Sequence, residues 1–132
     1  MAEVSPILDS LERRNHTISI DSVVNGKLEE MIERGLKVMA LCNDGTGRSH
    51  RVAEELSKKG IPAVSLEEGL KTIDKSSHLY PYLLDQINKV PMVAIVLTIE
   101  EQGLFNGILQ NLRAHRYTSS DSAIESLTKM AA

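Results

Sequence analysis

Short apolar runs alternate with amphipathic segments along most of the chain. Residues 38–41, 61–66 and 92–97 have the length and the apolar content of buried strands. Residues 17–20 alternate β-branched with polar side chains and predict one more short strand. Because helical patterns separate these runs, we expect an α/β fold in a single domain over 1–132. The expected architecture is a three-layer sandwich, in which a mainly parallel sheet of about four strands has helices on both faces.

Six segments have helical spacing or a helix-start signal. They are residues 6–14, 24–34, 49–59, 70–73, 79–88 and 101–115. We expect Asp21 or Ser22 to cap the second of these helices. Thr98 and Glu101 have the spacing of a capping box at the last one. The polar residues 117–122 predict a loop, and the tail that follows them is expected to fray.

The composition is that of an ordinary globular protein, with 42% hydrophobic and 25% charged residues. The net charge of −3 offers no basic field for nucleic acid or an anionic membrane, and aromatic residues, at 3%, are too few for base-stacking platforms. A single cysteine leaves no internal disulfide and favours a reducing compartment. The N-terminus lacks the pattern of a secretory signal, and no apolar run approaches the length of a membrane span. We therefore expect a cytoplasmic protein without nucleic-acid or membrane partners.

The segment with the clearest chemistry joins the strand at 38–41 to the helix at 49–59. Its sequence is CNDGTGRS, from Cys42 to Ser49. Glycines allow a backbone to turn its N–H groups toward an anion, and the start of the following helix adds a partial positive charge. Arg48 contributes a planar fork that matches the geometry of phosphate. We expect phosphate to be bound by the residues of this loop, namely Asn43, Asp44, Gly45, Thr46, Gly47 and Arg48.

Cys42 is the expected nucleophile, because the positive surroundings of the loop favour its thiolate form. Ser49 can hydrogen-bond the sulfur or assist its departure as a leaving group. Cys42 also lies where a strand ends, and ligands of open α/β sheets bind at the carboxyl ends of the strands. The pattern predicts a site that holds an oxyanion and attacks it with sulfur.

Cys42, Gly45, Gly47, Arg48 and Ser49 occupy every fixed position of the pattern C-x-x-G-x-G-R-[ST]. The loop therefore resembles the signature of the cysteine-dependent protein phosphatases. The resemblance implies that the cysteine forms a phosphocysteine, that the arginine binds the phosphoryl oxygens and that the hydroxyl aids breakdown of the intermediate.

Two positions differ from most tyrosine and dual-specificity phosphatases. Leu41 stands where those enzymes place His, a change that the low-molecular-weight class tolerates. Asp44 puts a carboxylate beside the anion site, where it repels a substrate. Some receptor-type pseudophosphatases carry Asp at this place, and so do the active myotubularin-like lipid phosphatases.

The flanking segments resemble three different branches. Residues 28–41 look like the segment that leads into the cysteine strand of dual-specificity phosphatases. Residues 95–113 are similar to the later part of low-molecular-weight-type phosphatases. Residues 42–73 resemble the end of a rhodanese domain, although rhodaneses usually have one residue fewer between the cysteine and the arginine.

A phosphatase also needs a general acid that protonates the leaving oxygen. Dual-specificity enzymes carry it upstream of the cysteine, which nominates Asp21 at a strand end, with Asp9 as the other upstream choice. Asp74 and Asp85 are the downstream options. A helix cap is the alternative role of Asp21.

Together these residues predict a phosphomonoester hydrolase that acts on a phosphorylated protein or a small phosphomonoester through Cys42, Arg48 and Ser49. One alternative is a rhodanese-like sulfurtransferase with a persulfide on Cys42, and another is a non-catalytic, phosphate-binding pseudophosphatase. The sequence contains no cluster of His, Cys, Asp and Glu at ligand spacing and no nucleotide P-loop. We therefore expect neither a metal nor a cofactor.

Overall fold

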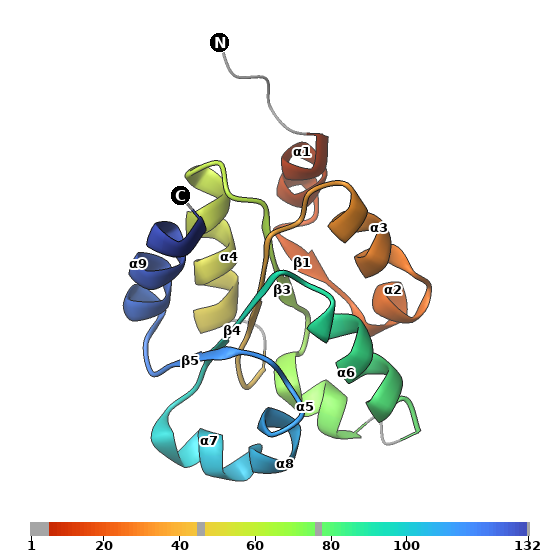
Figure 1. Ribbon diagram of the computed structural model, residues 1–132, viewed down its shortest axis with the longest axis vertical. Helices are drawn as coiled ribbons and strands as arrows, with labels where there is room; N and C mark the ends of the chain where they lie inside the picture. Colours follow the sequence, from red (N-terminus) through yellow and green to blue (C-terminus); the bar gives the residue numbers. More distant parts are fainter. Residues whose placement is uncertain (1–5, 45–46, 76–77, 132) are drawn as a thin grey trace.

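A computed structural model describes residues 6–44, 47–75 and 78–131 of the chain. Within these residues, five strands form one parallel sheet in the order β1-β3-β2-β4-β5 (Figure 1). The strands are β1 (Thr17–Ile18), β2 (Val38–Leu41), β3 (Ala63–Leu66), β4 (Met92–Val96) and β5 (His115–Tyr117). The predicted α/β class is confirmed, with five strands in place of about four.

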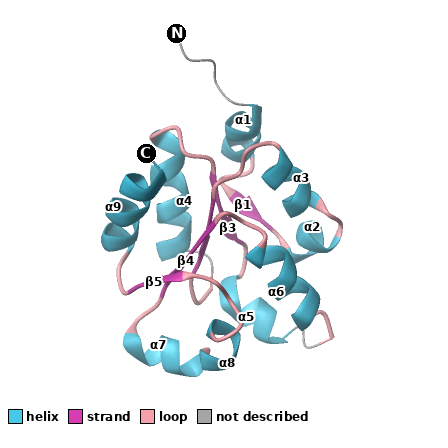
Figure 2. Cartoon of the chain, in the orientation of Figure 1, coloured by secondary structure: helices cyan, strands magenta, loops and turns pink. Residues whose placement is uncertain are grey.

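The central strands are apolar on both faces because helices cover both. Val38 and Ala40 of β2 pack in one core with α4 (Arg48–Lys58) and α9 (Ser120–Ala131). Met39 and Leu41 belong to the core on the opposite face. The helices of that face are α1 (Pro6–Arg13), α2 (Ile20–Val24), α3 (Lys27–Glu33), α5 (Gly69–Lys75), α6 (Tyr80–Asn88) and α8 (Asn106–Leu109). Figure 2 shows the sheet between the two helical layers, which is the predicted three-layer sandwich.

The chain after β4 differs from its prediction. The single helix expected over 101–115 is wrong, because the chain forms α7 (Ile99–Leu104), α8 and then β5. Gly103 and Gly107 lower the helix propensity of this stretch. β5 pairs with the edge of β4 that would otherwise be open. The fraying expected for the tail is also wrong, since α9 buries Ala123 and Leu127 in the core that α4 shares.

The helix predicted over 24–34 is the shorter α3, and a separate helix, α2, precedes it. Gly26 separates them, and its φ of +84° lies in the left-handed region that glycine adopts without strain. The residue that caps α2 is Ser19, because the Ser22 N–H donates to the Ser19 hydroxyl at 3.1 Å. Asp21 therefore lies in the first turn of α2 and does not cap it.

The chain reverses its direction across the sheet next to β2. From β2 it crosses through α4 to β3, and from β3 it returns through α5 and α6 to β4, on the other side of β2. These two connections lie on opposite faces of the sheet. In open parallel sheets such a reversal leaves a crevice outside the carboxyl ends of the strands, and ligands bind there. A ligand-binding site is therefore expected among the residues that follow β2 and β4.

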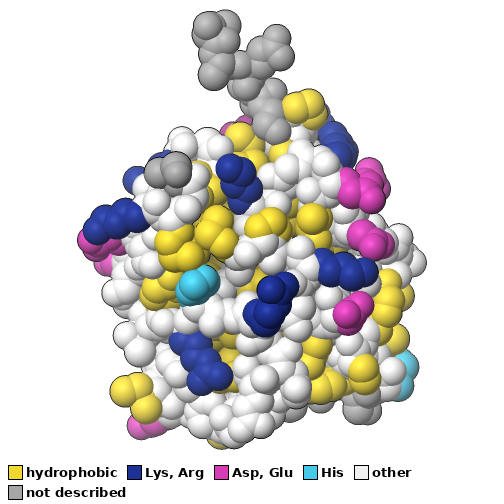
Figure 3. All heavy atoms as spheres, viewed as in Figure 1, with side chains coloured by type: hydrophobic (Ala, Val, Ile, Leu, Met, Phe, Trp, Pro, Cys, Tyr) yellow, Lys and Arg dark blue, Asp and Glu magenta, His cyan; other side chains and the backbone are white. Residues whose placement is uncertain are grey.

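The surface gives two observations on partners. On the face shown in Figure 3, basic and acidic side chains are interspersed with apolar and neutral ones, so this face carries no single-sign field. In the described part of the chain, none of the helices combines the length and the apolar character that a membrane crossing needs.

Candidate functional site

Cys42 lies directly after β2, at the reversal point of the sheet. It is 1% exposed, and its Sγ lies 3.1 Å from the Oγ of Ser49, which is fully buried in the first turn of α4. The Cys42 carbonyl accepts a hydrogen bond from the Leu70 N–H in the first turn of α5 at 2.9 Å. The structure therefore brings the predicted nucleophile and the predicted hydroxyl together, between a strand end and the starts of two helices.

Arg48, the first residue of α4, is held by Glu101 in the first turn of α7. Its Nη1 donates to Oε1 at 2.7 Å and its Nη2 donates to Oε2 at 2.9 Å, which makes a bidentate pair. The side chains of Arg48 and Glu101 are 31% and 16% exposed, so solvent screens the pair only in part. The hydrogen bonds to Glu101 raise the pKa of Arg48, which stays charged at all relevant pH values.

Glu101 is fixed from a second side by its own helix start. The Thr98 N–H donates to Oε1 of Glu101 at 2.8 Å, and the Glu101 N–H donates to the Thr98 hydroxyl at 3.2 Å. These two bonds complete the predicted capping box. Hydrogen bonds from Arg48 and then from the Thr98 backbone lower the pKa of Glu101 from 4.5 to about 2, against the opposing effect of burial. Glu101 is therefore a carboxylate at neutral pH and cannot donate a proton.

The ion pair between Arg48 and Glu101 is the feature of the site that sequence reasoning missed. The two residues are 53 positions apart, and no local pattern links them. The signal is topological, because β2 and β4 are neighbours in the sheet. Segments that follow adjacent parallel strands leave the sheet at the same edge. A capping carboxylate after β4 is thus placed to meet an arginine that follows β2.

Arg48 keeps binding capacity beyond Glu101. A guanidinium has five N–H donors, and two of those of Arg48 point at the Glu101 carboxylate. The other donors lie on the remaining edges of the group, where an oxyanion can bind. The carboxylate fixes the plane of the guanidinium and also repels an incoming anion. Glu101 thus improves the geometry of anion binding and weakens its electrostatics.

The rest of the predicted phosphate loop is described in part. Asn43 is half-buried, and its Oδ1 is buried without a hydrogen-bond partner in the described residues. Asp44 is exposed, and its charge adds to the effect of Glu101 on the pKa of Arg48. Gly47 precedes α4 with a φ of −120°, so the positive φ that a glycine allows is not used there. Gly45 and Thr46 lie outside the described residues.

Among the nominated general acids whose side chains the structure describes, none pairs with Arg48. Asp21 is exposed after β1, and β3 lies between β1 and β2. Asp9 and Asp85 each form an exposed ion pair four residues along their own helices. The side chain of Asp74 falls outside the described part of the structure. The carboxylate in contact with Arg48 is Glu101, which the sequence did not nominate.

No family model, curated protein or solved structure matches this chain. Its function is therefore inferred from its own residues. Over 6–44, 47–75 and 78–131, no group of three or more His, Cys, Asp or Glu residues could hold a metal ion.

Proposed function

We propose that the chain is a cysteine-dependent phosphomonoester hydrolase, in which Cys42 forms a phosphocysteine. The observation that carries this proposal is the 3.1 Å contact between Cys42 Sγ and Ser49 Oγ at the carboxyl end of β2, next to Arg48. A thiol, a hydroxyl and a guanidinium at a helix start combine a nucleophile with a binding site for an anion. The reversal point of a parallel sheet is where such a site is expected. The resemblance of the loop to the phosphatase signature supports the same chemistry.

The proposed reaction consists of two displacements at phosphorus. The Cys42 thiolate attacks the phosphorus atom, the S–P bond forms, and the bond to the ester oxygen breaks while that oxygen takes up a proton from solvent water. Water then attacks phosphorus, the S–P bond breaks, and inorganic phosphate leaves. Ser49 hydrogen-bonds the departing sulfur, and Arg48 stabilises the charge on the phosphoryl oxygens.

Protonation of the leaving oxygen is the step for which the described site supplies no clear general acid. Glu101 is ionised at neutral pH, since its pKa is about 2. Asp21, the predicted acid, follows β1, which two strand spacings, about 10 Å, separate from β2. Esters with a good leaving group need little protonation. We therefore expect aryl phosphates to be hydrolysed faster than alkyl phosphates.

Hydrolysis of p-nitrophenyl phosphate tests the proposal. Cys42→Ser should abolish turnover, and Arg48→Lys should lower it by about a hundredfold or more because the planar fork is lost. Arg51→Gln is the matched control, since Arg51 is an exposed arginine of the same helix that pairs with Asp121. Acid quenching of the wild type should trap one phosphoryl group on Cys42 by mass spectrometry. Undiminished turnover in Cys42→Ser would reject the mechanism.

A phosphate-binding module without turnover is a second candidate. Two observations favour it: Cys42 is 1% exposed, and the fork of Arg48 is engaged by Glu101. Cys42 has to become accessible before its sulfur can attack phosphorus, and Glu101 weakens the attraction of Arg48 for the phosphoryl group. For such a module, phosphate should shift the amide resonances of the loop while no phosphomonoester is hydrolysed. Sulfur transfer predicts a different result, namely one added sulfur on Cys42 after exposure to thiosulfate.

A further inference from the structure

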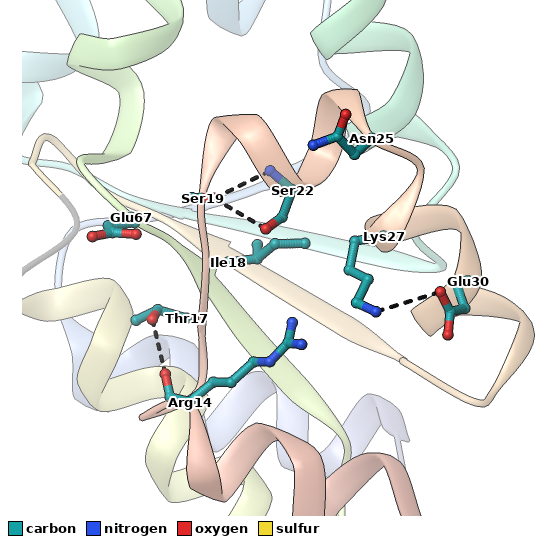
Figure 4. A pocket seen from close by; sticks show the side chains of 9 residues that line it. All are labelled: Arg14, Thr17, Ile18, Ser19, Ser22, Asn25, Lys27, Glu30 and Glu67. Carbon is teal, nitrogen blue, oxygen red and sulfur yellow. Dashed lines mark hydrogen bonds and ion pairs between the residues drawn. The ribbon is translucent and has the colours of Figure 1, made fainter.

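An open pocket of about 550 Å³ lies along β1, at the edge of the sheet (Figure 4). Its walls come from the residue that follows α1, from β1, from α2 and its flanking residues, from α3, and from the residue that follows β3. None of the described residues of the loop 42–49 lines it. β3 separates this pocket from β2, so it is a second candidate site of the chain.

Two cationic side chains from different elements converge in the pocket. Arg14 follows α1, and its guanidinium forms no hydrogen bond or ion pair with a residue that the structure describes. Lys27 begins α3, and its Nζ is 3.7 Å from Glu30, which is a loose and half-exposed contact. Figure 4 shows the head groups of Arg14 and Lys27 extending toward one another into the same space. Glu30 lines the same pocket and offsets part of the charge of Lys27, whereas Arg14 has no described counter-charge, so an anion between the two cations is stabilised mainly by Arg14 and also by Lys27.

The opposite part of the pocket accepts and donates hydrogen bonds. Glu67, after β3, has a carboxylate with no partner among the described residues and lies across the pocket from Lys27 (Figure 4). Ser19 and Ser22 add hydroxyl groups, which lie 3.1 Å apart. The carbonyl of Thr17 adds an acceptor, because the carbonyls before and after it bond to β3 and it points to the free edge. This part suits hydroxyl groups that donate to a carboxylate and to a carbonyl.

The lining excludes several other ligands. Among the described residues of the wall, Ile18 alone is apolar. An apolar ligand therefore gains little free energy by burial in this pocket. Its described residues include no aromatic side chain, which a nucleobase would need for stacking. Glu67 repels a second anionic group, so a ligand with one charged end and neutral polar groups fits best.

We propose that this pocket binds a phosphorylated polyol of the sugar phosphate class. The phosphate lies between Arg14 and Lys27, and the hydroxyl groups of the sugar donate to Glu67 and bond to Ser19 and Ser22. The site goes beyond the proposed hydrolase and does not require it, because no atom of Cys42 or Arg48 takes part.

Calorimetric titration with glucose 6-phosphate, glucose and inorganic phosphate tests the proposal on the full chain. We expect saturable binding of glucose 6-phosphate that is at least about tenfold tighter than that of either part alone. Arg14→Gln and Lys27→Gln should each weaken it by about tenfold or more, since each removes a charge-assisted hydrogen bond. Arg13→Gln is the matched control, because Arg13 is 73% exposed and pairs with Asp9. It should leave the affinity unchanged.

Two outcomes would overturn the assignment. Glucose that binds as tightly as its phosphate would show that the two cations do not hold an anion. Loss of binding in Arg48→Gln, with full binding in Arg14→Gln, would show that the phosphate occupies the Cys42 loop instead. Amide resonances map the location independently of the variants, and those of residues 14–30 should move on titration while those of 41–49 stay in place. The same mapping separates failure of this site from failure of the hydrolase, which depends on 41–49.

Discussion

Arg48 and Arg14 occupy two contrasting environments in one sheet. Arg48 follows a central strand, and its two Nη atoms both donate hydrogen bonds to the Glu101 carboxylate. Arg14 precedes the edge strand β1 and extends into an open pocket without a described partner (Figure 4). The difference follows from position, because a central strand has neighbours on both sides that supply counter-charges and exclude water. At the edge, water hydrates a charge and no pairing is needed.

The two environments have different consequences for function. At the centre, Cys42 is buried and Arg48 is paired, so ligand binding has to change an arrangement that already stabilises the fold. At the edge, Arg14 has no described partner and Lys27 has only a loose 3.7 Å contact with Glu30, so both can bind a ligand with little rearrangement. We therefore expect substitutions at the centre to alter stability and those at the edge to alter binding alone.

The largest expected effect is a difference in the free energy of unfolding between variants of Glu101 and Glu67. Glu101→Ala removes the partner of a partly buried arginine and one half of a capping box, and we expect it to lower the free energy of unfolding by about 2 kcal/mol. Glu67→Ala removes a carboxylate without a described partner, so its effect should stay within about 0.5 kcal/mol. Urea unfolding followed by circular dichroism measures both. Equal losses for the two variants would contradict the contrast between centre and edge.

A smaller effect is expected in the pH dependence of stability. The pKa of Glu101 is about 2 in the folded protein, below its ordinary 4.5, so the ionised form stabilises the fold. This contribution is complete above a pH of about 4.5 and is lost as the pH falls through about 2. The free energy of unfolding of the wild type should therefore approach that of Glu101→Gln over this window. Urea unfolding at several pH values checks this, and a gap that stays constant down to pH 2 would assign the stabilisation to something other than the charge.

The parts of the fold that the sequence predicted are those with local causes. The strand at 38–41 and the helix that starts near Ser49 are each encoded by neighbouring residues, so the contact between Cys42 and Ser49 could be expected. β5 has a non-local cause. His115 and Arg116 are exposed and polar, and they form a strand because β4 offers an open edge.

The same distinction applies to the candidate site. The order of the strands decides which loops meet, and a single sequence does not state that order. Once β2 and β4 are known to be neighbours, the pairing of Arg48 with a carboxylate after β4 follows. The strand order also decides where Asp21 lies, because β3 inserts between β1 and β2 and Asp21 therefore follows a strand that does not adjoin the cysteine strand.

A still smaller effect is expected for the turn that shapes the edge pocket. Gly26 has a φ of +84° between α2 and α3, and Gly26→Ala should lower the free energy of unfolding by about 1 kcal/mol through backbone strain. Gly103→Ala is the matched control, since Gly103 is an exposed residue inside α7 with open space around its Cα. It should raise stability by about 0.5 kcal/mol, because alanine favours the helix. Thermal unfolding compares the two, and a change of the same sign in both would argue against strain at Gly26.

The smallest expected effect concerns Arg14 itself. Arg14→Gln should change the free energy of unfolding by no more than about 0.5 kcal/mol, because its guanidinium has no described partner to lose. Arg48→Gln in the same urea series should cost more, since it leaves the Glu101 carboxylate, which is only 16% exposed, without its counter-charge. If Arg14→Gln proved as costly as Arg48→Gln, Arg14 would be a structural residue, and its free charge could not be assigned to a ligand. If Arg14→Gln keeps the wild-type free energy of unfolding but no longer binds glucose 6-phosphate, binding and stability are separable at the edge of the sheet. At the centre they are not separable, because Arg48→Gln should change both.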